Sequence, residues 1–167
     1  MLTRLPNGTG VVIRAIRPDD KALLSAAVSR LSPESSRGRF LTSKSSFSAD
    51  ELRYLTEVDG VRHVALVALL ADDLERLIGV GRYVRLADDA ATAEVAIVVG
   101  DEFQGQGLGS RLGLLLADDA RAHGLQRFVA TMLSDNVAAH RLFAKISARL
   151  EKVTTHGIDE LVARLVA

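Results

Sequence analysis

The chain has 167 residues, of which 48% are hydrophobic and 25% charged, and this composition is typical of one soluble globular domain, here residues 1–167. Lysine plus arginine and aspartate plus glutamate both total 21, so the net charge is zero, which argues against a general nucleic-acid-binding protein. The absence of cysteine excludes a disulfide framework, a thiolate zinc site and a cysteine nucleophile.

The first eight residues lack the apolar core of a signal peptide. The longest apolar run, Val64 to Ala71, is far too short to span a bilayer. We therefore expect a cytoplasmic protein whose partners include neither a membrane nor a nucleic acid. We expect a monomer or a homodimer.

The N-terminal part is predicted to hold one strand and three helices. Residues 11–17 show the alternation of a strand. Pro18-Asp19-Asp20 then opens a helix, because acidic residues are favoured in a first turn. A short helix is expected over residues 33–40. Ser48-Ala49-Asp50-Glu51 is a capping-box pattern that starts a third helix, ending near residue 56.

The central part reads as three strands, over residues 63–70, 76–85 and 92–99. Turns at Asp72-Asp73 and Ala87-Asp88-Asp89 separate them, and this spacing is typical of an antiparallel meander. A Gly-rich loop and an amphipathic helix follow, with Gly124 as the stop.

The last part is predicted as a strand over 126–132, a helix over 136–146, and strands over 149–155 and 161–166 that turn at His156-Gly157. The final segment also fits a helix. The element order predicts a mixed α/β domain around one central sheet.

The segment Gln104-Gly105-Gln106-Gly107-Leu108-Gly109 lies between a predicted strand and a predicted helix. Its three glycines allow positive φ angles and a close approach of the backbone to a ligand. Successive N–H groups at a helix start form an anion site, so a diphosphate can bind there without a lysine. A loop in which the glycines only make a tight turn is the plainer alternative.

Three phosphate-binding motifs compete for this loop. A Walker A loop fails because Gln106 stands at the lysine position, and a dinucleotide fingerprint fails because Ser110 stands at the third glycine. The pattern Gln/Arg-x-x-Gly-x-Gly/Ala, the acyl-CoA pyrophosphate loop of the GNAT acetyltransferases, is matched fully by Gln104, Gly107 and Gly109.

The sequence resembles the GNAT superfamily from about residue 10 to residue 166, and within it the GNAT domain of bacterial protein lysine acetyltransferases. Besides the loop, the resemblance is carried by the stretches Ile13 to Asp20, Leu31 to Ser35, Arg39-Phe40, Val58-Asp59, Ala65 to Ala68 and Ala93 to Val99. It implies an α/β (α+β) GNAT fold, with a mixed, mostly antiparallel sheet of six to seven strands flanked by helices.

The resemblance also implies that acetyl-CoA lies in a cleft where two parallel strands splay apart, the one ending at Val98-Val99 and the one over 126–132. No metal is implied. The residues that the resemblance assigns to the cofactor are Val98, Val99, Gln104, Gly105, Gln106, Gly107, Leu108, Gly109, Ser110, Asn136 and Phe143.

The helix after Asn136 departs from the family pattern Asn-x-x-Ala-x-x-Leu-Tyr-x-x-x-Gly-Phe. Phe143 replaces the tyrosine and Ser147-Ala148 replaces Gly-Phe. In the family the tyrosine commonly protonates the leaving thiolate. Phenylalanine has no proton to donate, so that role is vacant or lies elsewhere in this chain.

Glu94 is the candidate catalytic residue, since a glutamate at this place acts as general base in the lysine acetyltransferases that the chain resembles. A lysine amine has a pKa of about 10.4, so its neutral form costs roughly 4.6 kcal/mol at pH 7. A buried carboxylate can take that proton, directly or through water. The plainer reading is a glutamate that faces solvent near a strand end.

Other polar residues have two readings each. Ser134 could help to protonate the thiolate but fits a loop or capping hydroxyl better, and His140 could contact the cofactor but fits a surface histidine better. His63 and Asp59 suggest either a polar cluster near the acceptor or ordinary loop residues. His123 suits the end of a helix, and the four histidines are too scattered to suggest a metal site.

The sequence therefore predicts an acetyl-CoA-dependent N-acetyltransferase that acts on a primary amine. The expected acceptor is a protein lysine side chain, and a small-molecule amine is the alternative. A non-catalytic acyl-CoA sensor or interaction module on the same fold is the alternative of another class, and the missing tyrosine favours it.

Overall fold

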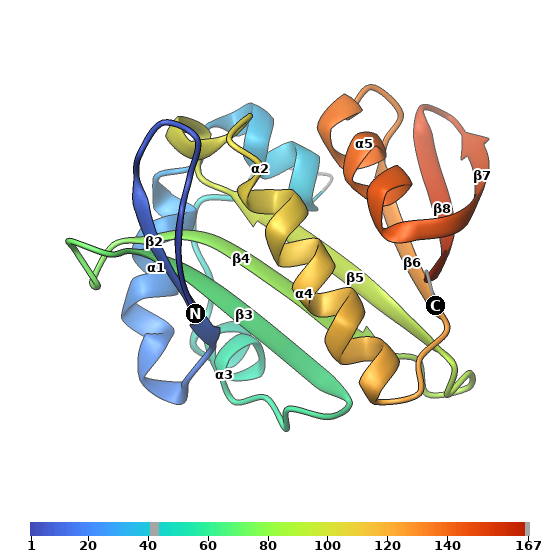
Figure 1. Cartoon of the computed structure of the whole chain (residues 1–167), viewed down its shortest axis with the longest axis horizontal. Helices are drawn as coiled ribbons and strands as arrows, with labels where there is room; N and C mark the ends of the chain where they lie inside the picture. Colours follow the sequence, from blue (N-terminus) through green and yellow to red (C-terminus); the bar gives the residue numbers. More distant parts are fainter. Residues whose placement is uncertain (41–43, 166–167) are drawn as a thin grey trace.

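The computed structural model describes residues 1–40 and 44–165, with the side chains of residues 38–40 left aside. Figure 1 shows a twisted sheet with helices on both faces. The elements in chain order are β1 (Leu2–Arg4), β2 (Gly10–Ala15), η1 (Pro18–Asp20), α1 (Lys21–Ser29), α2 (Pro33–Phe40), α3 (Ala49–Thr56), β3 (His63–Leu70), β4 (Leu77–Arg85), β5 (Thr92–Val99), η2 (Asp101–Phe103), α4 (Leu108–Ala122), β6 (Arg127–Leu133), α5 (Val137–Ile146), β7 (Ser147–Thr155) and β8 (Ile158–Leu165).

The described strands form one eight-stranded sheet in the order β1-β2-β3-β4-β5-β6-β8-β7. Neighbouring strands are antiparallel except for β5 and β6, which are parallel. The predicted meander is confirmed as β3, β4 and β5, and the predicted mixed, mostly antiparallel sheet is confirmed as well.

Two features differ from the prediction. The sheet has eight strands rather than six or seven because Leu2–Arg4 adds an edge strand, which is too short and polar to stand out in the sequence. The last segment, which also fitted a helix, is the strand β8, and it alternates strictly between a buried and a more accessible face from Asp159 to Leu165. That period of two is the strand signal.

Helix α4 packs closely on β4 because two glycines there leave room for it. A Cβ on Gly79 would lie 3.3 Å from a methyl of Leu108, and one on Gly81 would lie 2.9 Å from a methyl of Leu116. Helix α5 joins α4 on this face, over β6 and β8 (Figure 1). Helices α1 and α3 cover β3 and β4 on the other face.

The capping box predicted at Ser48 is present in both directions: the Glu51 N–H donates to the Ser48 hydroxyl at 3.1 Å, and the Glu51 carboxylate accepts from the Ser48 N–H at 2.7 Å. This reciprocal pair fixes the start of α3. Among the described residues, no helix is long and apolar enough to cross a membrane.

Candidate functional site

The parallel strands β5 and β6 are joined only at their starts. Their register covers Thr92 to Glu94 against Arg127 to Val129, and beyond Glu94 no described residue of β6 pairs with β5. The two strands therefore splay apart over the second half of β5, as the resemblance to the GNAT superfamily implied.

The open edge of β5 offers main-chain hydrogen-bonding groups to this gap. Gly100 N–H donates to the Ile78 carbonyl at 2.8 Å, so the even-numbered residues of β5 direct their N–H and C=O groups at β4. By the alternation of an antiparallel ladder, Val95, Ile97 and Val99 direct theirs into the gap. Val98 instead directs its main-chain groups at β4. The Val99 carbonyl accepts from the Gln104 side chain at 3.0 Å, so the Val99 N–H and the main-chain groups of Val95 and Ile97 are the ones that face the gap for a ligand.

The Gly-rich loop lies at the end of that open edge. Gly105 and Gly107 have φ angles of 72° and 80°, and Gly107 is the N-cap of α4. A Cβ on either glycine would meet nothing within 4 Å, so space lies in front of this backbone. A left-handed glycine at a helix start, with open space before its N–H groups, fits a bound diphosphate.

The loop residues assigned to the cofactor contribute in different ways. Leu108 is only 1% exposed and its side chain packs in the core, which leaves its main-chain N–H for a ligand. Gly109 follows in the first turn of α4, where a Cβ would touch Val99 at an ordinary 3.6 Å. Packing within the protein therefore tolerates a small side chain at residue 109, which agrees with the Gly/Ala choice at this position of the motif.

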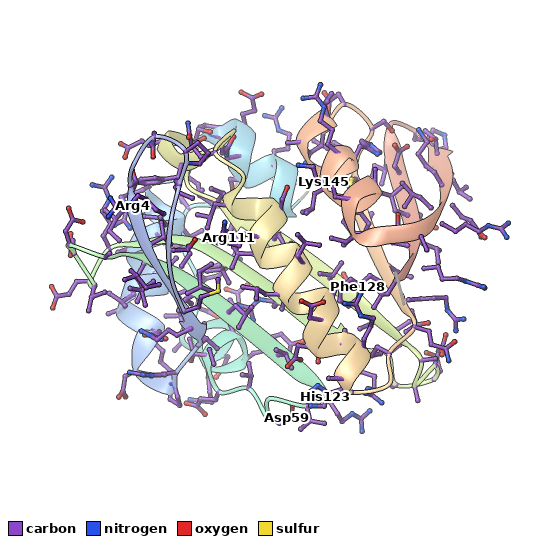
Figure 2. The ribbon with its side chains drawn as sticks, in the orientation of Figure 1. Arg4, Asp59, Arg111, His123, Phe128 and Lys145 are labelled. Atoms are coloured by element: carbon purple, nitrogen blue, oxygen red, sulfur yellow. The ribbon has the colours of Figure 1, made fainter. Side chains whose placement is uncertain are left out.

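A cation that sequence reasoning missed stands beside the loop. The Lys145 ammonium of α5 donates to the Ser110 hydroxyl, in the first turn of α4, at 3.3 Å. Figure 2 shows Lys145 between α5 and α4. The lysine and the loop are far apart in sequence, so no motif spacing could have joined them. Its positive charge adds to the helix dipole in favouring an anion here.

Helix α5 presents the two family positions that lie beyond the loop. The Asn136 side chain caps α5 by accepting from the Ala139 N–H at 3.1 Å. Phe143 is 4% exposed and belongs to the core cluster under α4 and α5. It fills the space of the usual tyrosine with an apolar ring and supplies no acid.

Glu94 lies on β5 and is exposed. It pairs with Val84 of β4 and Val129 of β6, so it stands at the last rung before the strands splay. Because its side chain alternates with those facing α4, it points to the opposite face of the sheet. The burial assumed for a general base is therefore absent in the protein alone and would have to come from a docked acceptor.

An apolar cavity of about 100 Å³ lies away from Glu94, between α1, the start of β4 and the end of β5. Its lining is mainly apolar and includes Leu24, Val28, Leu31, Phe47, Val98 and Phe103. Glu94 does not line this cavity. The candidate base is therefore exposed to solvent, on the face of the sheet opposite α4 and outside this cavity.

His140 is not the solvent-facing histidine that the sequence favoured. Its Nε2 atom lies 3.0 Å from an oxygen of Asp159, a fully buried carboxylate on β8, and both atoms are shielded from solvent. The other Asp159 oxygen accepts from the hydroxyls of Thr154 at 2.6 Å and Ser134 at 2.7 Å. These hydrogen bonds, that of Thr154 first, hold the pKa of Asp159 below its usual value.

Ser134 therefore has its proton directed at Asp159, and the cap of α5 is Asn136 instead. Asp159 joins α5, the end of β6 and the β7–β8 hairpin, and no sequence motif pointed to it.

His63 and His123 both make contacts that order the local structure. Asp59 accepts from the N–H groups of Val61, Arg62 and His63 at 2.8 to 2.9 Å, which is a loop-ordering arrangement. A guanidinium nitrogen of Arg82 lies 3.0 Å from His63 Nε2. Because a guanidinium can only donate, His63 Nε2 must be the acceptor. Burial, with Arg82 adding to it, lowers the pKa of His63 to about 4. His123 caps the end of α4, where Figure 2 labels it, as expected.

A family model matches this architecture. The model for the acetyltransferase (GNAT) family covers residues 33–147, which include the splayed strands, the loop and α5. The chain belongs to the GNAT acetyltransferase family. Among the described residues, no group of three or more side chains that could hold a metal ion occurs.

Individual relatives agree with this assignment. The chain is 33% identical over 105 residues to the acetyltransferase PA5475 of Pseudomonas aeruginosa, covering 62% of this chain and 56% of that protein. It is 44% identical over 61 residues to the acetyltransferase Pat of Mycolicibacterium smegmatis, covering 36% of this chain and 18% of that protein. The chain thus spans about half the length, or less, of these relatives.

Among solved structures, the GNAT domain of S. lividans PAT superimposes with a TM-score of 0.87 at 29% identity, over 99% of this chain and 96% of that one. The backbones of the two chains therefore follow similar paths over almost their whole lengths.

Proposed function

We propose that this GNAT acetyltransferase transfers the acetyl group of acetyl-CoA to the side-chain amine of a lysine on a protein, with Glu94 as general base. The observation that carries the proposal is the combination of a splayed parallel pair with an open β5 edge and a Gly-rich helix start at its end. The edge matches the amides of a pantetheine arm, and the helix start matches a diphosphate.

The exposure of Glu94 supports a macromolecular acceptor. Sites for small molecules are concave and bury most of the ligand surface. Glu94 instead is exposed to solvent and lies outside the apolar cavity. A folded protein that presents a lysine can cover such an exposed residue, and its docking supplies the burial that the site lacks on its own.

The roles of the chain's own residues follow from their positions. Bound acetyl-CoA supplies a thioester carbonyl for attack. Glu94 accepts the ammonium proton, directly or through water, so that the neutral amine can form the C–N bond. The N–H groups of β5 that face the gap stabilise the negative charge that develops on the carbonyl oxygen. The nitrogen of the tetrahedral adduct loses its second proton to solvent as the C–S bond breaks, and the thiolate takes a proton from solvent because Phe143 has none to give.

The proposal is tested by following CoA release with acetylated acceptor proteins as products and with small amines in parallel. We expect Glu94→Gln to lower the rate by about 100-fold, the usual scale for a general base, and to leave acetyl-CoA affinity nearly unchanged. The variant should recover part of its rate between about pH 8 and 10, where solution supplies free amine. Glu160→Gln, an exposed glutamate of β8, is the matched control.

A wild-type rate for Glu94→Gln near neutral pH would contradict the role of this residue. Faster transfer to a small amine than to any protein would contradict the lysine acceptor. The apolar Phe143 also favours a second candidate, an acyl-CoA sensor, and a chain that binds acetyl-CoA tightly but transfers to no acceptor would establish it.

A further inference from the structure

The phosphate-binding loop is tied to helix α2 by a small network centred on Asp101. Asp101 is the first residue of η2, directly between β5 and the Gly-rich loop. Its carboxylate accepts from the N–H of Ser32 at 3.0 Å, the hydroxyl of Ser32 at 2.7 Å and the hydroxyl of Ser35 at 2.5 Å. Three donors from the start of α2 thus converge on one side chain of the loop.

The same serines define how α2 begins. The Ser35 N–H donates to the Ser32 hydroxyl at 3.1 Å, and the Ser36 N–H donates to the Ser32 carbonyl at 2.9 Å, so Ser32 occupies the capping position. A carboxylate beside a helix start interacts favourably with the helix dipole. Partial burial would raise the pKa of Asp101, but hydrogen bonds from Ser35 and Ser32 outweigh it and lower the pKa. The carboxylate is thus the charged partner of the first turn of α2.

The network also includes the first residue of the cofactor motif. The Gln104 amide donates to the Ser35 hydroxyl at 2.9 Å and to the Val99 carbonyl at 3.0 Å. Val99 belongs to the open edge of β5, and the Ser35 hydroxyl donates its own hydrogen bond to Asp101. The chain of hydrogen bonds therefore runs from Gln104 through Ser35 to Asp101. Consecutive hydrogen bonds in such a chain polarise and strengthen one another.

Helix α2 lies against both β5 and β6, the two strands that splay apart. A change in the order of α2 would therefore be felt beside the proposed cofactor cleft. We propose that Asp101 and Ser35 are positioning residues that couple the acyl-CoA loop to α2, so that a ligand on the loop orders the first turns of α2. This inference rests on the proposed acetyl-CoA site. It adds a link between that site and the helix beside the splayed strands.

Hydrogen exchange measured with CoA as the probe tests the link. In the wild type, saturating CoA should slow exchange of the amides of residues 35–37 by at least about threefold, because a fixed loop holds the carboxylate at the start of α2. Asp101→Ala should lose this protection. Asp101→Asn should keep part of it, since one oxygen of Asp101 accepts both hydroxyls.

The matched control is Glu102→Ala, which removes the next side chain of the same loop. Glu102 pairs with Arg76 at 2.6 Å rather than with α2, so CoA should still protect residues 35–37 in this variant. If Asp101→Ala fails to fold, Ser35→Ala removes the central link of the chain and carries the same expectation.

The outcomes separate this inference from the proposed function. Wild-type protein that does not bind CoA by calorimetry would refute the proposed function. Wild-type protein that binds CoA without slower exchange in α2 would overturn the coupling alone. Equal loss of protection in Asp101→Ala and Glu102→Ala would also overturn it, because the effect would then belong to the loop in general.

Discussion

At Gly107, both the backbone conformation and the proposed ligand require a glycine. Its φ of 80° lies in the left-handed region, and it precedes the first N–H groups of α4. Because a Cβ there would meet no protein atom within 4 Å, the internal packing does not demand a glycine. What does demand it is the backbone conformation, together with a ligand in the open space.

We expect Gly107→Val to weaken acetyl-CoA binding at least tenfold, because a branched side chain disfavours positive φ and stands where a phosphate would lie. Calorimetric titration of acetyl-CoA measures the effect. Gly60→Val is the control, since Gly60 has a similar φ of 72° in a turn before β3 and equally open surroundings. If both variants bind acetyl-CoA alike, the loop is not the phosphate site.

At the scale of elements, one buried carboxylate adds to the β6–β8 pairing that joins the β7–β8 hairpin to the rest of the sheet. Asp159 faces His140 of α5, Ser134 beyond β6 and Thr154 of β7, and the Lys152 ammonium lies 3.6 Å from its second oxygen. A buried charge of this kind is stable only while its partners stay in place. Removing the charge therefore acts on several elements together.

We expect Asp159→Asn to lower the melting temperature clearly, because an amide cannot offer a second acceptor to the His140 side. Thermal unfolding followed by circular dichroism gives the measurement. Glu160→Gln changes the adjacent, exposed residue on the opposite face of β8 and should melt like the wild type. Equal melting of both variants would show that the buried cluster does not hold the hairpin.

Most elements could be predicted from the sequence because their signals are local. The predicted bounds of strands 63–70 and 92–99 agree with those of β3 and β5, and the capping box at Ser48 correctly predicted the start of α3. The splayed pair was expected from a family resemblance and then found in the strand register.

The contacts that hold the site together could not be predicted, since they join residues far apart in sequence. Ser32 and Ser35 precede Asp101 by 69 and 66 positions, and His140 meets Asp159 only because α5 crosses the β8 strand. Such pairs depend on helix placement and strand register, which local sequence patterns do not reveal. The exposure of Glu94 likewise follows from what covers each sheet face rather than from the residues around it.

For the molecule as a whole, His63 makes stability depend on pH. Burial, reinforced by Arg82, lowers its pKa to about 4, against about 6.5 for free histidine. The unfolded chain therefore binds a proton that the folded protein resists between these values. This contribution is fully present above about pH 6.5 and is lost as the pH falls towards about 4; after allowance for solvent screening it is roughly 2 kcal/mol or less.

Urea unfolding between about pH 7 and 4.5 measures this effect. The wild-type midpoint should fall with pH, and His63→Gln should fall less steeply, because glutamine still accepts from Arg82 but does not titrate. His156→Asn, in the exposed turn between β7 and β8, should retain the wild-type slope. An unchanged slope in His63→Gln would assign the pH dependence to other groups.

The short parallel register has a consequence for the life of the protein in a cell. Three rungs join β1–β5 to the part that carries β6, β7 and β8, and one core cluster under α4 and α5 spans the same seam. A ligand that pairs with the free edge of β5, as proposed, would add main-chain hydrogen bonds at this seam and so stabilise the folded form. Proteases act on the open form in proportion to its population, and a ligand that binds only the folded form lowers that population. Acetyl-CoA bound in this gap would therefore slow the degradation of the protein as well as serve as its substrate.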